Sequence, residues 1–391
     1  MKNVNKVAGY FMTGKIAEKL DDAKMLMDEA VKDPKSAEKE KTWFYRAQVY
    51  AEILKATEPA VRQMAPDAVD VILESFDKIE ALEGGPNGKM GQQTILIREG
   101  IRVALFNRGV EEQKEPEKAY QTFKDVARIA PDDTLAIKYA GYFAAQADKN
   151  EEALALYQKL LEDTAYNQVD VYHYITQIRS MELQKMQNQV NQLKDREAPE
   201  SEIKATEAKM TAYKDATHAL VREGSEKFPD DIYLLGRSID FYIYDGKSKE
   251  AIQMLHKATK LAPDNAVLYT NLGLLYYRDF QDEPKAIENY KKSIEIDPND
   301  FNSQMGMAII HYNRGAKIMS DLKIEVYENK KSPEMVSVLK HFKEALPYME
   351  KAHEISPNEI QPLAPLKSIY RELGMRDKEK AMDAKIKSSM E

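Results

Sequence analysis

The most regular feature of the chain is a small residue followed, at helical spacing, by a large one. Alanine recurs along the sequence, and a large apolar or aromatic residue stands four positions after it. These pairs are Ala119 and Phe123, Ala153 and Tyr157, Ala251 and Leu255, Ala286 and Tyr290, and Ala345 and Met349. Residues four apart lie on one face of an α-helix, where a small side chain lets two helices approach closely. The pattern therefore predicts closely packed helices.

Proline and the spacing of these alanines divide the helices into repeating units. A proline follows most of the segments, at Pro131, Pro263, Pro298 and Pro357. Because proline cannot continue a helix, each one predicts a corner between two helix pairs. Ala119 and Ala153 are 34 residues apart, Ala251 and Ala286 are 35 apart, and the longer gaps fit the same period with two insertions. A pair this short cannot bury its apolar face alone, so stacked pairs are expected rather than an ordinary helical bundle.

One segment in the second half resembles the tetratricopeptide repeat (TPR) family. The first helix of that family carries an aromatic residue, a Leu-Gly pair and a second aromatic residue, which match Tyr269, Leu272-Gly273 and Tyr276. Partial matches are at Trp43, Ala47 and Tyr50, at Ala140-Gly141 and at Met305-Gly306. Ser238-Ile239 departs from the pattern, so the repeat at 232–265 is identified mainly by its second helix. The family has a period of about 34 residues.

The fold class predicted is an all-α TPR superhelical solenoid of about nine antiparallel helix pairs. The expected pairs are 4–34, 40–83, 99–131, 134–165, 168–229, 232–263, 266–298, 301–357 and 360–389. The expected domains are N-terminal helix pairs at 1–83, a Gly-rich linker at 84–98, a central array at 99–300, and a C-terminal pair with an insertion plus a capping pair at 301–391. A polar C-terminal helix from Arg376 onward suits the cap that a solenoid needs.

Two insertions lengthen helices. Near 171–220 two apolar stripes at roughly heptad spacing flank a turn at Glu197–Glu200, which predicts a projecting coiled-coil-like hairpin. Those apolar positions either seal the hairpin to itself or leave a surface for docking or dimerisation. The second insertion, 316–338, is expected to be helical, with a corner at Ser332-Pro333.

Composition and charge narrow the classes of partner. The net charge is −8 and no Lys/Arg block is present, which disfavours nucleic acid and anionic membranes. No apolar run approaches the ~20 residues needed to span a bilayer. There is no cysteine, which excludes disulfides and thiolate chemistry. The apolar run near the start of the chain is too short to form the core of a signal peptide. The protein is therefore expected either to be cytoplasmic or to have lost an export signal by cleavage.

Three short segments resemble exported TPR proteins of Bacteroidetes-type bacteria. They are Lys41–Arg46, Tyr312–Gly315, and Ala345–Ala352 with the Ser356–Asn358 that follows. Those relatives usually begin with a cleavable signal. The resemblance implies a periplasmic or cell-envelope location.

Catalytic, cofactor and metal motifs are not found. The loop at 84–91 contains Gly88-Lys89 but lacks the glycine spacing and the hydroxyl residue of a P-loop. The six histidines form no His-Glu-x-x-His motif or close ligand pair on one helix face. There is no nucleophile elbow and no strand pattern for a dinucleotide fold. We therefore expect that the chain is not an enzyme and that it binds neither a cofactor nor a metal ion.

The resemblance implies a ligand-facing wall built from the first helix of each pair. Carried over, the family's ligand-facing positions give the predicted peptide-binding residues Lys138, Tyr142, Tyr233, Arg237, Asp240, Asn271, Tyr277 and Gln304. Donors there could bind a peptide backbone and aromatics its side chains. The carboxylate clamp of some TPR proteins is absent, because Gly236 and Asp240 precede Asn271, and Asp300 and Gln304 follow it.

Two functions from different classes follow. The first is a non-enzymatic scaffold that binds a protein or peptide partner on the concave TPR surface. The alternative is a structural subunit that forms a homodimer through the hairpin or a terminal repeat. The first predicts a groove with convergent polar and aromatic groups, and the second predicts an apolar patch and a concentration-dependent mass.

Overall fold

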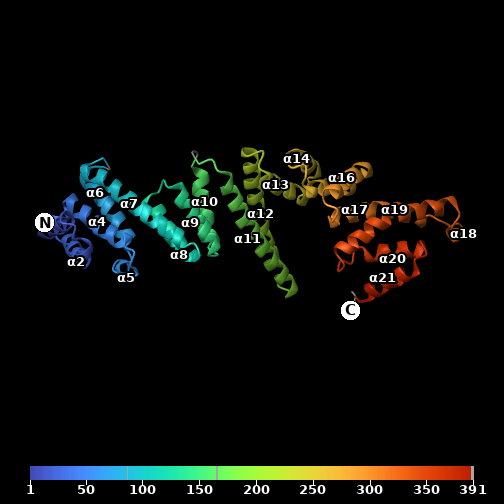
Figure 1. Cartoon of the computed structure of the whole chain (residues 1–391), viewed down its shortest axis with the longest axis horizontal. Coiled ribbons are helices and arrows are strands. Elements are labelled where there is room, and N and C mark those ends of the chain that lie inside the picture. Colours follow the sequence, from blue (N-terminus) through green and yellow to red (C-terminus); the bar gives the residue numbers. More distant parts are fainter. Residues whose placement is uncertain (86, 164–165, 389–391) are drawn as a thin grey trace. The chain divides into compact units, whose positions relative to one another are not determined.

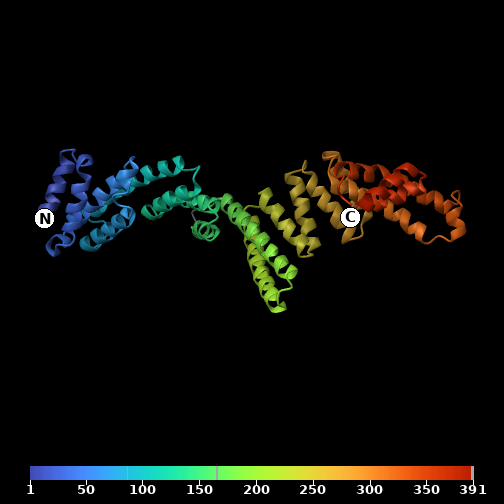
Figure 2. The same cartoon turned by 90° about the horizontal axis from the view of Figure 1, so that it is seen from below.

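The computed structural model describes residues 1–85, 87–163 and 166–388, and all regular structure in these ranges is helical. It divides into two compact units, Met1–Tyr213 and Lys214–Glu391, which are described separately. Within each unit consecutive helices run antiparallel and pack in pairs (Figure 1 and Figure 2). No helix among the described residues has both the length and the apolar composition needed to cross a bilayer.

The first unit contains the following helices, given in chain order. They are α1 Lys2–Met12, the 3-10 turn Ala17–Lys19, α2 Leu20–Ala30, α3 Pro34–Ala37, α4 Glu40–Lys55, α5 Pro59–Arg62, α6 Ala68–Glu83, α7 Lys89–Glu111, α8 Pro116–Ile129, α9 Thr134–Gln146, α10 Asn150–Glu162 and α11 Val169–Asp195. The segment expected as a linker at 84–98 is helical from Lys89 onward. The Glu83 carboxylate accepts hydrogen bonds from the N–H groups of Met90 and Gly91, both at 2.8 Å, and so caps α7 early.

Helix α12, Glu200–Lys227, crosses from the first unit into the second. The remaining helices are α13 Ile232–Tyr244, α14 Ser248–Leu261, α15 Ala266–Arg278, α16 Glu283–Ile296, α17 Phe301–Ser320, α18 Ile324–Glu328, α19 Pro333–Ile355, α20 Leu363–Glu372 and α21 Arg376–Ser388. Ser332 caps α19 and Pro333 is its first residue, as expected for the corner of the second insertion.

The alanines predicted to permit close packing do so. All five are fully buried: Ala119, Ala153, Ala251, Ala286 and Ala345. Their large partners four residues on are buried with them. After the proline corners, an Asp or Asn side chain caps the next helix, as Asp133 does for α9, Asp231 for α13, Asn265 for α15 and Asp300 for α17.

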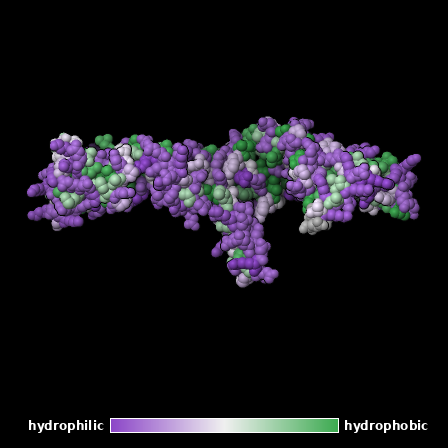
Figure 3. All heavy atoms as spheres, turned by 60° about the horizontal axis from the view of Figure 1, so that its bottom comes forward, coloured by the Kyte–Doolittle hydropathy of each residue, from purple (hydrophilic) through white to green (hydrophobic). Residues whose placement is uncertain are grey.

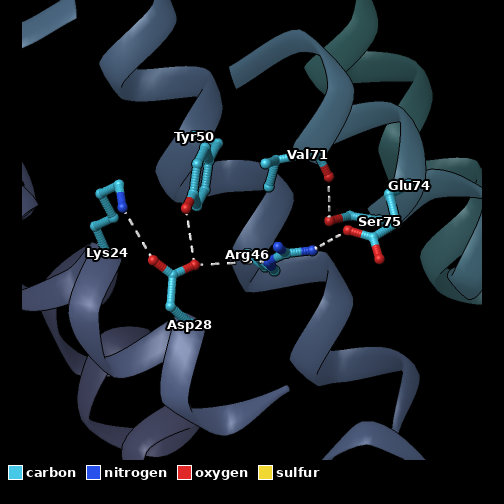
Figure 4. A network of polar contacts seen from close by, with 7 residues as sticks. All are labelled: Lys24, Asp28, Arg46, Tyr50, Val71, Glu74 and Ser75. Atoms are coloured by element: carbon cyan, nitrogen blue, oxygen red, sulfur yellow. Dashed lines mark hydrogen bonds and ion pairs between the residues drawn. The ribbon is translucent and has the colours of Figure 1, made fainter. Parts of the chain in front are cut away.

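Polar networks also join helices. In the first unit, Asp28 on α2 accepts hydrogen bonds from Lys24 at 3.0 Å and from the Tyr50 hydroxyl at 2.7 Å, while Arg46 pairs with Glu74 on α6 at 2.6 Å (Figure 4). Burial, together with Asp28, raises the pKa of Tyr50 to about 12. The network therefore holds a protonated tyrosine and ties α2, α4 and α6 together.

In the second unit Glu372, at the end of α20, anchors the segment between α17 and α19. Its side chain is 1% exposed and accepts hydrogen bonds from Tyr327 at 2.9 Å, Lys330 at 2.9 Å and Arg371 at 3.1 Å. Burial alone would raise the pKa of Glu372, but the hydrogen bonds from Lys330, Tyr327 and Arg371 outweigh it and hold that pKa below its usual value.

Candidate functional site

A glycine in the first helix of several repeats faces an aromatic ring of the following helix. A Cβ atom added at Gly109 would lie 2.7 Å from the Phe123 ring, and one added at Gly273 would lie 2.6 Å from the Tyr290 ring. Gly141 faces Tyr157 in the same way. Since only a glycine fits so close to a ring, these glycines mark equivalent positions in different repeats.

The glycines reveal a repeated pair of exposed apolar side chains. The residues six before and one after each glycine are Val103 and Val110 in α7, Leu135 and Tyr142 in α9, and Val267 and Leu274 in α15, and all six are exposed. Val267 is 60% exposed and Leu274 is 38% exposed. In α13, Ile239 stands in the place of the glycine, and the same offsets give Tyr233 and Asp240, which are also exposed. Each of these helices therefore presents exposed side chains at equivalent positions.

In the second unit two such rows share one spacing. Tyr233, Arg237 and Asp240 follow one another at positions i, i+4 and i+7 of α13, so they lie on one helix face. Val267, Asn271 and Leu274 stand 34 residues later and have the same spacing on α15. These six residues are called the α13–α15 face below. In Figure 3 hydrophobic residues gather on the surface over α13 and the helices that follow it.

The charges on this face are only partly neutralised. Arg237 lies 3.3 Å from the Asp240 carboxylate, and its guanidinium is 5.8 Å from the centre of the Tyr233 ring. Partial loss of solvent around the Asp240 carboxylate raises its pKa, although Arg237 opposes the shift. The same cause raises the pKa of Tyr233, so its hydroxyl stays protonated. The face thus offers an aromatic ring, a cation and an anion beside apolar side chains.

The other two predicted residues of the second unit have partners within the protein. The Tyr277 hydroxyl accepts a hydrogen bond from Asn313 of α17 at 2.9 Å. Gln304 is 5% exposed and donates a hydrogen bond to the carbonyl oxygen of Pro298 at 2.9 Å. Gln304 therefore holds the corner before α17 rather than lying on the surface, and ligand contact through it stays a prediction.

The row of exposed pairs does not continue into α17. Gly306 faces the Tyr290 ring of the preceding helix α16, so it is not the equivalent of Gly273. The positions 34 residues after Val267 and Leu274 are Phe301, which is half-buried, and Ala308, which is fully buried. Met305 and Ala308 join the core with Leu366 and Tyr370 of α20. The helices that follow α17 therefore cover it, and the α13–α15 face ends at α15.

In the first unit the two predicted residues lie on α9. Lys138 forms an ion pair with Asp170 of α11 at 2.9 Å, which raises the pKa of the lysine and occupies its charge. Tyr142 is exposed, and its ring meets Phe143 and Tyr174 edge-on. Of these two, Tyr142 alone has much of its surface open to a partner.

The far end of α11 and the start of α12 lie side by side. Lys194 pairs with Glu207 at 2.8 Å, and Arg196 pairs with Glu202 at 2.6 Å across the turn. Val190 and Leu193, part of the predicted apolar stripe, are buried. Their burial leaves these two residues unavailable to a second chain, and dimerisation through the hairpin stays a prediction.

Sequence reasoning missed the apolar members of the face. Val267 and Leu274 follow the helical period, and apolar residues at that period are usually core residues. Their offsets from Gly273 repeat those of Val103 and Val110 from Gly109, and this recurrence was the signal that could have found them.

A histidine cluster was also missed. His341 and Glu344 are three residues apart on α19, and His311 of α17 lies against them. A spacing search along the sequence does not find this set, because the third residue comes from another helix.

Comparison with known proteins identifies the repeats. The model described as TPR repeat matches residues 240–279, and the model described as tetratricopeptide repeat matches residues 266–300. Together these ranges contain the end of α13 and all of α14, α15 and α16, and hence Asp240, Val267, Asn271 and Leu274 of the α13–α15 face. Residues 240–300 therefore contain tetratricopeptide repeats, and the predicted all-α class built from such repeats is confirmed. No curated protein matches the chain in sequence.

Solved structures of TPR proteins are among those to which the chain is similar. YrrB, described as a TPR protein with an unusual peptide-binding site, is 17% identical, with a TM-score of 0.38 and coverage of 54% of this chain and 95% of YrrB. MamA AMB-1 is 16% identical, with a TM-score of 0.37 and coverage of 50% and 92%. A TPR repeats protein from Bacteroides fragilis is 15% identical, with a TM-score of 0.27 and coverage of 69% and 98%.

Proposed function

We propose that the chain is a non-catalytic scaffold that binds a protein partner by holding a peptide segment against the α13–α15 face. TPR domains mediate protein–protein interaction, and the repeat matches cover this part of the chain. One observation carries the proposal: Val267 and Leu274 are exposed at the same repeat positions as Tyr233 and Asp240. Contiguous exposed apolar side chains with a polar surround are typical of interaction surfaces.

The chemistry of the face defines the peptide that it would accept. Val267 and Leu274 would bury apolar side chains of the peptide, and Tyr233 would add an amphipathic ring. Asn271 can donate to and accept from a peptide backbone. Arg237 would favour an acidic residue at one end of the segment. Its ion pair with Asp240, at 3.3 Å, leaves both side chains about half-exposed, so the guanidinium can also reach a carboxylate of the peptide. An apolar segment with one flanking carboxylate therefore fits best.

The test begins with selection of peptides from a displayed random library against the full chain. The affinity of the selected peptides is then measured by fluorescence anisotropy for wild type, Leu274→Asp and Leu261→Asp. Leu261 is an exposed leucine at the end of α14, outside the face, and is the matched control. Loss of one buried leucine contact is worth about 1.5–3 kcal/mol, so Leu274→Asp should weaken binding by about tenfold or more.

Leu261→Asp should leave the affinity within about twofold of wild type, because an isolated surface substitution usually changes little. The proposal fails if no peptide is selected, or if both variants weaken binding equally while circular dichroism shows that each keeps the helical content of wild type. Such a result would place the contact elsewhere on the chain.

A location in the bacterial cell envelope belongs to the same proposal and rests on the resemblance of three short segments alone. Fractionation of the native organism tests it. Recovery of the chain with a periplasmic marker is expected, and recovery with a cytoplasmic marker would refute it.

A further inference from the structure

The packing of α17 against α19 brings three metal-binding side chains together. The Nδ1 atom of His311 and the Nδ1 atom of His341 each lie 3.2 Å from the same carboxylate oxygen, Oε2 of Glu344. One potential ligand atom from each residue lies within 4.8 Å of those from the other two. His341 and Glu344 share a face of α19, and His311 comes from α17. The three side chains thus converge from two helices.

Hydrogen bonding alone does not satisfy this arrangement. His341 Nδ1 has a hydrogen bond to Glu344, but the Nδ1 atom of His311 is buried and has no hydrogen-bond partner of acceptable geometry. A buried polar atom without a partner is costly, and each such case calls for an explanation. A cation placed between the three residues would use the lone pairs of both imidazoles and the carboxylate oxygen together.

The distances suit a small transition-metal ion. Zinc binds histidine nitrogen and carboxylate oxygen at 2.0–2.2 Å in tetrahedral geometry, which places neighbouring ligand atoms about 3.3 Å apart. The two nitrogen–oxygen separations of 3.2 Å already match that spacing. Two imidazoles and one carboxylate favour zinc or a similar ion over calcium and magnesium, which prefer all-oxygen sites.

The surroundings of the set leave it accessible. The ring of Tyr348 lies parallel to that of His311, with an interplanar angle of 3° and a centroid distance of 6.3 Å. Glu344 is 38% exposed, so an ion can enter from solvent. Arg314 lies nearby, but Glu283 neutralises it at 2.7 Å. Lys340 and Lys343 line the shallow cavity beside Glu344 and oppose binding.

We propose that His311, His341 and Glu344 form a binding site for one divalent transition-metal ion, of which zinc fits best. Three protein ligands leave a fourth position open to water or to a group from another molecule. A bound ion would join α17 to α19 next to the second insertion, and metal binding would therefore stabilise the folded chain.

Isothermal titration of the chelator-treated full chain with ZnCl₂, and with NiCl₂ in parallel, tests this site. One ion per chain is expected, and Co²⁺ should give the visible absorption bands of tetrahedral coordination. His311→Gln and Glu344→Gln should each weaken Zn²⁺ affinity by at least about tenfold, since loss of even an outer-shell partner commonly costs 10–100-fold. His353→Gln, which removes a histidine of the same helix outside the cluster, should change it less than twofold.

The unfolding temperature gives a second readout. Zinc should raise it for wild type and for His353→Gln but not for the two cluster variants, while all four metal-free proteins should show the same helical content. Absence of binding at millimolar Zn²⁺ would overturn the proposal. So would binding of equal strength in wild type and the cluster variants, because that result would mean adventitious association with other surface groups.

Discussion

Replacement of Gly273 by alanine tests the close packing that positions the α13–α15 face. A Cβ atom at this position would lie 2.6 Å from the Tyr290 ring. Favourable carbon–carbon contacts are at about 3.5–4.0 Å, so the overlap is about 1 Å. The ring cannot easily move away, because Tyr290 is 3% exposed and Gly306 closes on it from α17.

Two opposing terms set the size of the effect. Overpacking of a well-packed core costs about 1–3 kcal/mol. Alanine is favoured over glycine inside a helix by about 1 kcal/mol, which offsets part of that cost. Because the ring is held from two sides, we expect the overpacking cost at the upper end of its range. The net loss of unfolding free energy should therefore be about 1–2 kcal/mol.

Urea unfolding followed by circular dichroism measures this difference, and Gly236 provides the matched control. Gly236 is also inside a helix of the second unit, α13, but no atom lies within 4 Å of an added Cβ. Gly236→Ala should therefore raise the free energy of unfolding by up to about 1 kcal/mol. In a Tyr290→Leu background the cost of Gly273→Ala should shrink, since the ring that opposes it has gone.

The reasoning is refuted if Gly273→Ala raises the unfolding midpoint as Gly236→Ala does. That result would mean that the Tyr290 ring shifts without cost and that the glycine does not set the distance between α15 and α16.

Two further predictions concern the carboxylates of Glu372, which is buried, and Asp300, which is half-buried. Because the folded-state pKa of Glu372 is lowered, its contribution to stability is complete above the unfolded-state pKa of about 4.3 and is lost as pH falls through the folded-state value. Glu372→Gln should lower the free energy of unfolding, measured by urea titration, by about 1–3 kcal/mol at pH 7. The difference from wild type should become smaller as the pH falls below about 4.3. Glu354→Gln, at an exposed glutamate, should show neither effect. Asp300 caps α17 and accepts hydrogen bonds from Ser303 N–H at 3.1 Å and from the Thr270 hydroxyl at 2.5 Å. Asp300→Ala should cost about 1–3 kcal/mol in thermal unfolding, and Asp300→Asn, which can still cap, should cost less; equal losses would contradict the capping argument.

The sequence was sufficient to predict those features of the structure that depend on the local pattern of residues. Buried alanines such as Ala286, and the corner at Ser332-Pro333, follow from helix periodicity and from the lack of an N–H in proline. The exposure of Tyr233 and Asp240 followed from their place in the repeat. Gln304 was also predicted to face a ligand but is buried: its side chain donates a hydrogen bond to the carbonyl oxygen of Pro298, and the neighbouring Met305 and Ala308 pack with α20. No local pattern contains that information.

Contacts between residues far apart in the sequence explain the remaining differences between the sequence-based predictions and the structure. His311 meets His341 and Glu344 only because α17 and α19 pack along each other, since the two histidines are 30 positions apart in the sequence. Val267 and Leu274 were missed for a different reason. Helical periodicity alone does not distinguish an apolar residue that faces the core from one that faces a partner.

The Tyr290 ring between Gly273 and Gly306 also limits how this array could have grown by gene duplication. In a repeat array each unit is stabilised mainly by contacts with its neighbours. A duplicated segment that starts just after Gly273 and ends at Gly306 would carry the Tyr290 ring and one of its two glycines. If copies of this segment were joined end to end, each ring would again lie between two glycines. A segment cut between Tyr290 and Gly306 and joined to a residue with a larger side chain would instead create the overlap described for Gly273→Ala. A joint at this place in the array is therefore tolerated only where a small residue again faces the ring.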